Sequence, residues 1–324
     1  IWDGGKVIYH YHIWKIEIDK ELVDKNYLYY LLDWDKELIK SEQGAGTTMV
    51  HVTKGSMEKR ILPFPSVEEQ KRIVAILDQV FIDIEKALAT AETNLKNARE
   101  LFDSYLQQVF SQRGDDWKNS TLATICKIKP PKSEAREKLT GDDNVSFVPM
   151  NCLGINRIDL DLQQSRKLSE VLGSYTYFAD NDVLLAKITP CFENGKLGLA
   201  SNLINGIGFG SSEFIVFRCQ EGLCPKFLYH FLSRKTFLEE GKARMSGAVG
   251  HKRVAKEFIE NYVIMYPPAG KQIELIEKID LLKYQIVKLE EIYFDKKALL
   301  DELKKSILQK AFTGELTKSK GIAA

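Results

Sequence analysis

The sequence predicts a mixed α/β fold in which two long helices each follow a globular segment. Three observations carry this prediction: the chain repeats itself at an offset of about 200 residues, each repeat ends in a heptad pattern, and short β-type runs lie between the two patterns. The 324 residues are 44% hydrophobic and 28% charged, which suits a core-forming protein and excludes wholesale disorder. No run approaches the ~20 apolar residues that span a bilayer.

The repeat is defined by identical residues at a constant offset of 202 positions. The anchoring pairs are Pro65 and Pro267, Gln70 and Gln272, Asp78 and Asp280, and Phe110 and Phe312. Upstream, at a slightly smaller offset, the aromatic segment 27–32 resembles 227–232. Because a period of about 200 residues is too long for a solenoid, the pattern indicates a duplicated domain.

Each repeat ends in a long helix with apolar residues at alternating steps of four and three. The positions expected to pack are Leu77, Val80, Ile84 and Leu101 in the first helix, and Ile279, Leu282, Ile286 and Leu303 in the second. From Glu68 to Phe110 the first helix would measure on the order of 65 Å at 1.5 Å per residue. A helix of this length favours a spacer, and the core of a helical bundle is the alternative.

Between the two helices the pattern changes to short strands. β-type runs at 145–148, 182–186 and 214–217 alternate with Gly, Asn and Asp turns, and 225–237 and 254–261 are expected to be helical. The expected segments are 1–62 (globular), 63–113 (helix), 114–266 (globular), 267–316 (helix) and 317–324 (tail). Segment 1–62 matches only the end of 114–266, so roughly 90 residues of the first globular domain are expected to be missing before Ile1.

Charge and cysteine content narrow the class of protein. The balance of 46 Lys and Arg against 45 Asp and Glu argues against nucleic-acid binding by bulk charge, but it leaves room for a local basic surface. The five cysteines form no CxxC pair, and the five histidines lack metal-ligand spacing, so no metal site is expected. An odd, scattered set of cysteines without a secretory signal predicts reduced thiols in a cytoplasmic protein.

Motifs for catalysis are not found in the sequence. It contains no GxxxxGK[ST] phosphate loop, no GxGxxG after a strand, no HExxH and no GxSxG. The Asn/Asp-Pro-Pro-aromatic motif of amino-methylating enzymes is also absent. Catalysis by this chain alone is therefore disfavoured.

Two stretches carry the residue types that contact nucleic acid. Segment 185–196 holds Lys187, Thr189, Asn194 and Lys196 after a strand, and such side chains contact phosphates and base edges. Segment 234–256 is rich in Lys and Arg and has a glycine-containing centre that would let its backbone approach a ligand. An ordinary solvated turn and a solvated helix–loop–helix corner are the respective alternatives.

The chain resembles the specificity subunits of type I restriction–modification systems. The segments that carry the resemblance are 61–73, 178–196, 208–214 and 309–317. Together with the duplication, their order is more specific than any one of them. Two features depart from the family pattern: Lys271 precedes Gln272 where Glu69 precedes Gln70, and most of the first domain is not represented.

The resemblance implies two target-recognition domains separated by two long helices that pack as an antiparallel coiled coil. Segment 1–62 would be the remnant of the first recognition domain and 114–266 the second. Each domain would read one half of a split site on double-stranded DNA, and the helices would set the spacing and hold two modification subunits. S-adenosylmethionine, ATP and magnesium are expected to bind to those subunits and to a restriction subunit, which would methylate adenine and cleave DNA. This chain is expected to bind no cofactor and to have no catalytic residue.

The residues expected to face DNA lie in both recognition domains. In the second domain they are Lys187, Thr189, Asn194, Lys196, Ser211, His251, Lys252 and Arg253, and in the first they are Thr47, Thr48, His51 and Lys54. Two other classes remain open. A DNA-independent coiled-coil scaffold would bind only proteins, and an autonomous methyltransferase would transfer methyl groups without partners.

Overall fold

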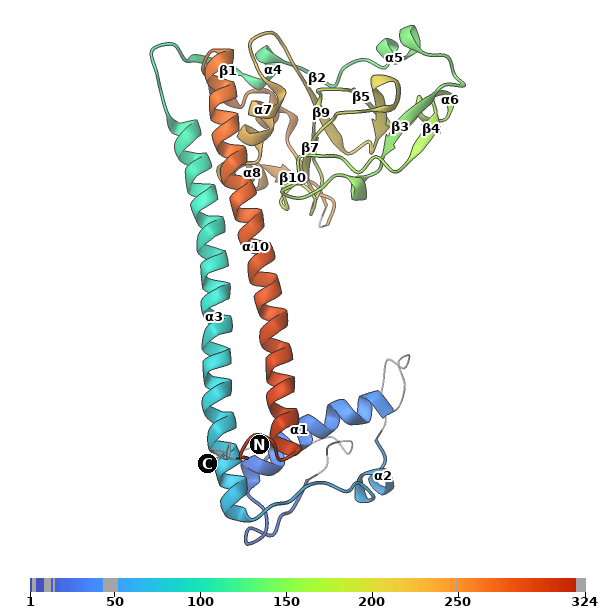
Figure 1. The fold of residues 1–324 in the computed structure, drawn as a ribbon. Helices are drawn as coiled ribbons and strands as arrows, with labels where there is room; N and C mark the ends of the chain where they lie inside the picture. Colours follow the sequence, from blue (N-terminus) through green and yellow to red (C-terminus); the bar gives the residue numbers. More distant parts are fainter. Residues whose placement is uncertain (2–3, 9–12, 14, 43–51, 249, 319–324) are drawn as a thin grey trace, which may run out of the picture. The chain divides into compact units, whose positions relative to one another are not determined.

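The fold is that of a computed structural model, which describes residues 1, 4–8, 13, 15–42, 52–248 and 250–318. Contacts divide the chain into two compact units, and each is described by itself. Unit 1 comprises Ile1–Lys96 and Lys288–Ala324, and unit 2 comprises Asn97–Val287. Each long helix is therefore shared, with one end in each unit (Figure 1).

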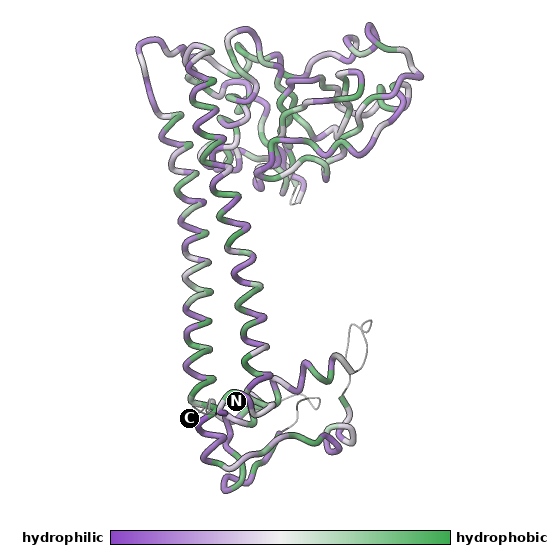
Figure 2. The backbone as a smooth tube through the Cα atoms, viewed as in Figure 1, coloured by the Kyte–Doolittle hydropathy of each residue, from purple (hydrophilic) through white to green (hydrophobic). Residues whose placement is uncertain are grey.

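The two long helices are α3 (Val67–Ser111) and α10 (Ala269–Phe312), with 45 and 44 residues. Prolines precede both helices, and the Ser66 hydroxyl accepts a hydrogen bond from the Glu69 N–H at the start of α3. The carboxylates of Glu68 and Glu69 in the first turn stabilise α3 by interacting with the positive end of its helix dipole. Apolar and polar segments alternate along both helices (Figure 2), as expected where only part of a helix surface packs.

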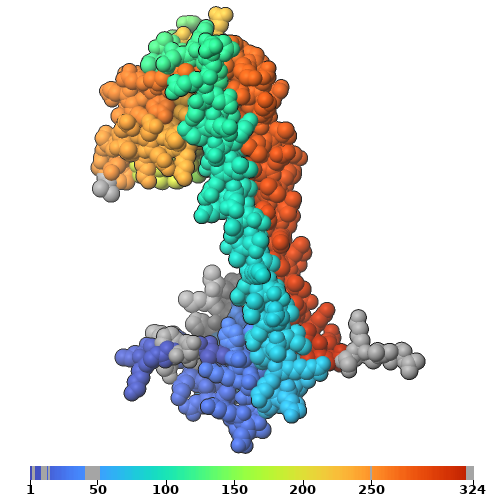
Figure 3. All heavy atoms as spheres, turned by 90° about the vertical axis from the view of Figure 1, so that its left-hand side faces the viewer, coloured from blue at the N-terminus to red at the C-terminus, as the bar shows by residue number. Residues whose placement is uncertain are grey.

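Unit 1 consists of α1 (Lys25–Glu42), α2 (Lys54–Glu58), the first part of α3 and the last part of α10. Tyr27 and Leu31 of α1 pack against Leu77 of α3 and Phe312 of α10 in one buried cluster. The atoms of α1 adjoin the first turns of α3 (Figure 3). The start of α3 thus packs with the end of α10.

Unit 2 contains two four-stranded sheets. Their strand orders are β2-β9-β6-β7 and β4-β3-β8-β5, and all pairs are antiparallel except β3 with β8. The bounds are β2 (Cys126–Ile128), β3 (Asn144–Val148), β4 (Ser165–Lys167), β5 (Thr176–Ala179), β6 (Val183–Ala186), β7 (Leu197–Leu199), β8 (Ile207–Gly210) and β9 (Phe214–Cys219). The β-type runs expected at 145–148, 182–186 and 214–217 correspond to β3, β6 and β9.

Two short ribbons, six short α-helices and two 3-10 helices, η1 (Met150–Cys152) and η2 (Ile204–Gly206), complete the described part of unit 2. The ribbons are β1 (Lys118–Thr121) with β12 (Val263–Tyr266), and β10 (Met245–Ser246) with β11 (Arg253–Val254). The helices are α4 (Leu122–Ile125), α5 (Ser133–Lys138), α6 (Leu168–Val171), α7 (Pro225–Leu232), α8 (Lys235–Ala243) and α9 (Lys256–Glu260). In the main core of the unit, Phe227 of α7 packs with Phe110 at the end of α3 and Ile279 near the start of α10.

Each unit therefore joins the start of one long helix to the end of the other, so α3 and α10 run antiparallel. This confirms the predicted mixed α/β fold with two long helices packed together. Among the described residues, no helix combines the length and apolar character needed to cross a membrane.

The duplication is preserved in buried hydrogen bonds. In unit 1 the Gln70 amide accepts from the Asp24 N–H at 2.8 Å and donates to the carbonyls of Leu22 and Pro65. In unit 2 the Gln272 amide accepts from the Cys224 N–H at 2.9 Å and donates to the carbonyls of Gly222 and Pro267. Both glutamine side chains are fully buried, and each ties its long helix to the segment that precedes α1 or α7.

The positions expected to pack differ in how far this chain buries them. Leu77, Ile84, Ile279 and Ile286 are buried, and Val80 and Leu282 are partly buried. However, Leu101 and Leu303 are 61% and 45% exposed, so they lie outside the buried seam of this chain, and their packing against another subunit stays a prediction. A straight α-helix drifts relative to a strict heptad, and near the helix ends the buried face has moved to Leu106 and Phe110 in α3 and to Leu308 and Phe312 in α10.

Candidate nucleic-acid interface

The loop that follows β6 is held by its buried phenylalanine. Phe192 is fully buried, its ring centroid lies 6.0 Å from that of Phe237, and a side chain at Gly241 would collide with its ring. Gly195 adopts a φ of +70°, the left-handed conformation that glycine tolerates best. The position of the loop is therefore fixed by the core beneath it, although its outer side chains are polar.

The second candidate segment forms a short exposed hairpin. β10 pairs with β11 so that Ser246 lies opposite Arg253, and the His251 N–H donates to the Ala248 carbonyl at 2.9 Å. His251 and Lys252 are exposed in the loop of this hairpin. Gly247 has a φ of +126°, a conformation that a residue with a side chain rarely adopts.

Backbone hydrogen bonds join the loop after β6 to this hairpin. The Thr189 N–H donates to the Lys252 carbonyl at 2.9 Å, and the Val254 N–H donates to the Lys187 carbonyl at 2.9 Å. Ile188 and Arg253 form an antiparallel bridge between these bonds. The structure thus brings together two segments that are about 60 residues apart in the sequence.

A third segment, the turn between β8 and β9, completes the cluster. The Lys187 N–H donates to the Glu213 carbonyl, and the Lys187 ammonium donates to the Ser212 carbonyl, both at 2.9 Å. The Arg253 guanidinium donates two hydrogen bonds to the Glu213 carboxylate, at 2.9 and 2.7 Å. We name the loop 187–196, the turn 211–213 and the hairpin 245–254 together the recognition cluster, of which all residues except 249 are described.

The central carboxylate of the recognition cluster is ionised. The hydrogen bond from Arg253 lowers the pKa of Glu213, and Lys187 and Arg253 lower it further by charge attraction, against the opposing effect of burial. A bidentate guanidinium–carboxylate pair fixes the plane of the guanidinium as well as its position. Arg253 is therefore held in a defined orientation at the surface while about half of its side chain stays exposed.

The sequence-predicted residues fall into two groups within the recognition cluster. Asn194, His251, Lys252 and Arg253 are exposed, whereas Lys187, Thr189, Lys196 and Ser211 are partly buried. The Lys196 ammonium donates to the Met150 carbonyl at 2.8 Å, and the Thr189 hydroxyl donates to Glu193 at 3.3 Å. The Ser211 hydroxyl accepts a hydrogen bond from the Glu213 N–H at 3.2 Å. The partly buried group thus makes structural contacts within unit 2.

Not every basic residue of segment 234–256 contributes to the surface. Arg234 is buried, donates to the Phe231 carbonyl, and lies 3.9 Å from the centroid of the Phe231 ring. Burial lowers the pKa of its guanidinium. Lys256 forms an ion pair with Glu260 at 3.3 Å. Exposed positive charge thus lies both in the hairpin, at Lys252 and Arg253, and outside it, at Lys235, Lys242, Arg244 and Lys256.

In unit 1, Lys54 is the only one of the four predicted contact residues that lies within the described residues. It begins α2, is exposed, and forms an ion pair with Glu58 at 3.6 Å. The preceding Thr53 hydroxyl accepts from the Ser56 N–H and caps the helix. Thr47, Thr48 and His51 lie outside the described residues.

Glu213, the acidic residue at the centre of the recognition cluster, is not among the residues that the sequence predicted to contact DNA. Glu213 lies inside the motif 208–214, but a carboxylate repels phosphate, and no local pattern pairs it with a residue 40 positions away. The glycines of that motif have a packing role. A side chain on Gly208 would collide with Phe178, and one on Gly210 with the Val148 carbonyl.

One family model matches most of the chain. The family model described as type I restriction modification DNA specificity domain matches residues 1–91 and 114–293. The chain is 31% identical over 229 residues to the EcoEI specificity subunit of Escherichia coli, covering 70% of this chain and 36% of that protein. It is 32% identical over 213 residues to the EcoAI specificity subunit of E. coli, covering 65% of this chain and 34% of that protein. The matches thus span about a third of the length of these curated relatives.

Solved structures share the fold at lower sequence identity. A structure that describes complex assembly and conformational transition of the type I R-M system aligns with a TM-score of 0.73 and 20% identity, covering 93% of this chain and 74% of that one. The HsdS subunit from Thermoanaerobacter tengcongensis aligns with a TM-score of 0.55 and 21% identity, covering 92% and 72%. These likenesses show that the chain shares its fold, including the paired long helices, with both structures.

Proposed function

The chain belongs to the family of type I restriction modification DNA specificity domains, and on this premise we propose that it reads double-stranded DNA in a sequence-specific manner. The recognition cluster of unit 2 would make the contacts, and the chain itself would carry no catalytic step.

The observation that carries the proposal is the convergence of three segments around the Arg253–Glu213 pair. Glu213 accepts from Nε and Nη2 of Arg253, which leaves the Nη1–Nη2 edge of the guanidinium for the two parallel hydrogen bonds through which arginine most often reads guanine. The neighbouring Lys252 and His251 are exposed and can donate to phosphates. A positioned guanidinium flanked by phosphate-binding groups is an arrangement suited to reading a DNA groove.

The duplication supports a split recognition site. The equivalent contacts of Gln70 and Gln272 give both units the same attachment to a long helix, so each would present a reading surface to one half of the site. The spacing between the halves would follow from the length of α3 and α10.

The surface of α10 supports binding of other subunits. Large apolar side chains that are exposed on this helix are Ile273, Leu281, Tyr284, Val287, Leu289, Ile292, Phe294, Leu299 and Leu303. Exposed apolar surface of this kind marks protein interaction sites. We propose that modification subunits cover this surface, and that there are two of them because the chain is duplicated. These subunits and a restriction subunit would bind S-adenosylmethionine, ATP and magnesium. The assembled complex would methylate adenine and cleave DNA in the cytoplasm.

The test is a DNA titration of the chain assembled with its modification subunit. Replacing Lys252 and Arg253 by alanine should weaken binding about tenfold or more and reduce the salt dependence of the affinity by one to two phosphate contacts. The matched control removes two positive charges from exposed positions on α5, Arg136 and Lys138. Unchanged affinity and salt dependence in the Lys252→Ala, Arg253→Ala variant would contradict the proposal.

A further inference from the structure

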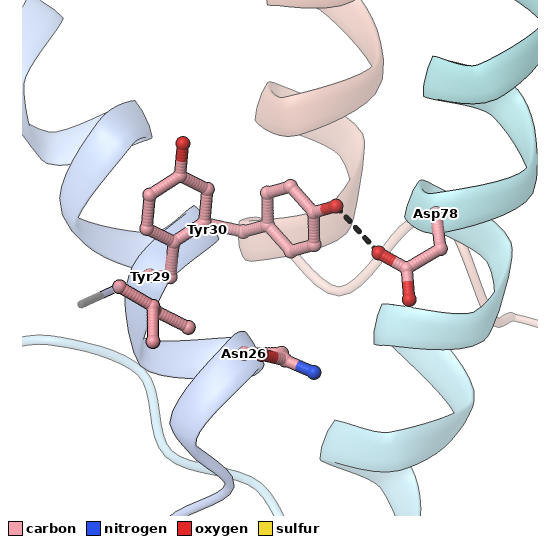
Figure 4. Close-up of a pocket in the computed structure, with 5 residues that line it drawn as sticks. Asn26, Tyr29, Tyr30 and Asp78 are labelled. Atoms are coloured by element: carbon pink, nitrogen blue, oxygen red, sulfur yellow. Dashed lines mark hydrogen bonds between the residues drawn. The ribbon is translucent and has the colours of Figure 1, made fainter. Parts of the chain in front are cut away.

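Unit 1 contains a small pocket between α1 and the first turns of α3. Its volume is about 200 Å³, and its lining residues are Ile1, Asn26, Tyr29, Tyr30 and Asp78. The Tyr30 hydroxyl donates to the Asp78 carboxylate at 2.5 Å, and the Tyr29 and Tyr30 rings meet edge to face at 5.4 Å (Figure 4). Tyr29 is 49% exposed, so the pocket is open to solvent.

The same constellation recurs in unit 2 at the positions related by the repeat. Tyr229 and His230 meet edge to face at 5.3 Å, as Tyr29 and Tyr30 do. His230 Nε2 lies 3.1 Å from the Asp280 carboxylate, as the Tyr30 hydroxyl lies beside Asp78. The two sites therefore share an aromatic pair, a polar ring group and a carboxylate in the same order.

The two sites differ in the group that faces the carboxylate. In unit 2 the Lys226 ammonium lies 2.5 Å from the second Asp280 oxygen, so a lysine of the same chain neutralises the acid. The repeat places Asn26 at the position of Lys226, and an amide carries no charge. Among the residues that the structure describes, none provides a cation to Asp78.

The chemistry of the unit 1 pocket matches a primary ammonium. The carboxylate of Asp78 supplies the negative charge, and tyrosine faces attract cations. In unit 2 a second ammonium, that of Lys283, lies 5.5 Å from the centroid of the Tyr229 ring. Burial, followed by the hydrogen bond to Asp78, raises the pKa of Tyr30, so this phenol remains a neutral donor to the carboxylate.

We infer that the pocket of unit 1 binds a lysine side chain of another protein chain, which occupies the place that Lys226 fills in unit 2. Unit 2 contains both four-stranded sheets, and the side chains of Lys226 and Asp280 are still 41% and 35% exposed. The position of the lysine ammonium is therefore accessible to solvent even where the adjoining globular domain is present. A lysine side chain has a flexible four-carbon stem and a compact charge, which suits a pocket of this size. The inference is independent of the DNA contacts proposed for unit 2.

The test uses the full chain labelled with ¹³C in its tyrosine rings and titrated with N-acetyl-lysine methylamide. Saturable shifts of the Tyr29 and Tyr30 signals are expected, with these signals assigned from Tyr29→Phe and Tyr30→Phe. Asp78→Asn should weaken the interaction at least about tenfold, because the charge that pairs with the ammonium is lost. Absence of saturable shifts, or shifts that persist in Asp78→Asn, would overturn the inference.

A second variant keeps the test informative if Asp78→Asn unfolds. Asn26→Lys introduces the lysine found in unit 2, and it should abolish ligand binding while the fold is kept. In the reverse exchange, Lys226→Asn should create a new ligand-dependent shift at Tyr229. Failure of either exchange to move binding in the stated direction would count against the inference.

Three further ligands identify the chemistry and its source. N-acetyl-arginine methylamide should bind more weakly than the lysine derivative, because the group that fills the equivalent place in unit 2 is the compact ammonium of Lys226. A neutral alcohol of the same length, 1-butanol, should cause no saturable shift, and an equal shift would mean that apolar contact drives binding. Tighter binding of putrescine than of the lysine derivative would indicate that the pocket binds a free amine rather than a protein side chain, and would overturn the assignment.

Discussion

His230 differs in chemistry from Tyr30, its counterpart in the first repeat. It is almost fully buried against Asp280, whereas the first repeat has Tyr30 beside Asp78. Burial lowers the pKa of His230, and although the hydrogen bond and charge of Asp280 oppose this effect, the nearby Lys283 and Lys226 reinforce it. The imidazole is therefore held neutral, in contrast to a histidine that gains a charged partner at the surface.

This environment makes stability depend on pH. In the unfolded chain the histidine binds a proton below its ordinary pKa of 6.5, while in the folded chain it does so only at a lower pH. The unfolded state thus holds more protons in this window, so the free energy of unfolding should fall as pH decreases below 6.5. The lowered pKa of Asp280 acts below its ordinary value of 3.8, outside this window.

The variant His230→Tyr, which copies the first repeat, should flatten this dependence. Urea unfolding at pH 7 and at roughly pH 5.5 measures the slope in the native chain and the variant. His251→Gln, which removes an exposed histidine, serves as the control and should retain the native slope. A native slope in His230→Tyr would show that other groups cause the dependence.

At the residue scale, the sequence indicated which segments are basic, but it did not indicate which of their side chains are buried. The basic character of segment 234–256 was visible, but nothing local distinguishes the buried Arg234 from the exposed Lys252. Arg234 is buried because the fold places it over the rings of Phe231 and Phe110, the latter more than 120 residues away in sequence. Long-range contacts of this kind leave no periodic signal.

At the element scale, the buried glutamines attach each long helix to its unit. Gln272 satisfies one N–H and two carbonyls, all in segments that lead into helices. An apolar side chain in its place would leave these groups without partners in a buried site, which costs about 1 to 3 kcal/mol for each group that water cannot reach. The start of α10 therefore depends on one side chain for its register against α7.

Gln272→Leu should lower the free energy of unfolding of unit 2 by about 2 to 4 kcal/mol. It should also speed hydrogen exchange of the Cys224 amide, which loses its acceptor. Urea titration and amide exchange measure the two effects. Lys271→Ala is the control next to it in sequence, because its exposed ion pair with Glu274 contributes little. Native stability in Gln272→Leu would refute this role.

Elements were predictable where a local pattern specifies them. The heptad repeats predicted α3 and α10, and the apolar runs between turn residues predicted β3, β6 and β9. The exposure of Leu101 and Leu303 was not predictable, because it depends on where each helix leaves its partner and packs on α7 or α1. The heptad pattern continues along each helix, whereas near its end the helix packs on α7 or α1.

At the scale of the whole molecule, the duplication explains how each unit is completed. The ring of Phe110 at the end of α3 lies 5.0 Å from that of Phe227, and the ring of Phe312 at the end of α10 lies 5.4 Å from that of Tyr27. Each unit thus takes the last turns of the long helix that belongs to the other repeat. The net charge of +1 averages helix surfaces of mixed charge with the basic residues that are exposed between Lys235 and Lys256.

The central claim is that this chain selects DNA by sequence, and selection from random duplexes tests it most directly. The chain is assembled with its modification subunit and incubated with a pool of random-sequence duplexes at fixed salt, and the bound DNA is sequenced after several rounds. We expect enrichment of at least one short block of fixed sequence, and loss of that enrichment in the Lys252→Ala, Arg253→Ala variant. Bound duplexes that remain random in sequence, from a complex that still assembles, would contradict the account and favour a DNA-independent scaffold.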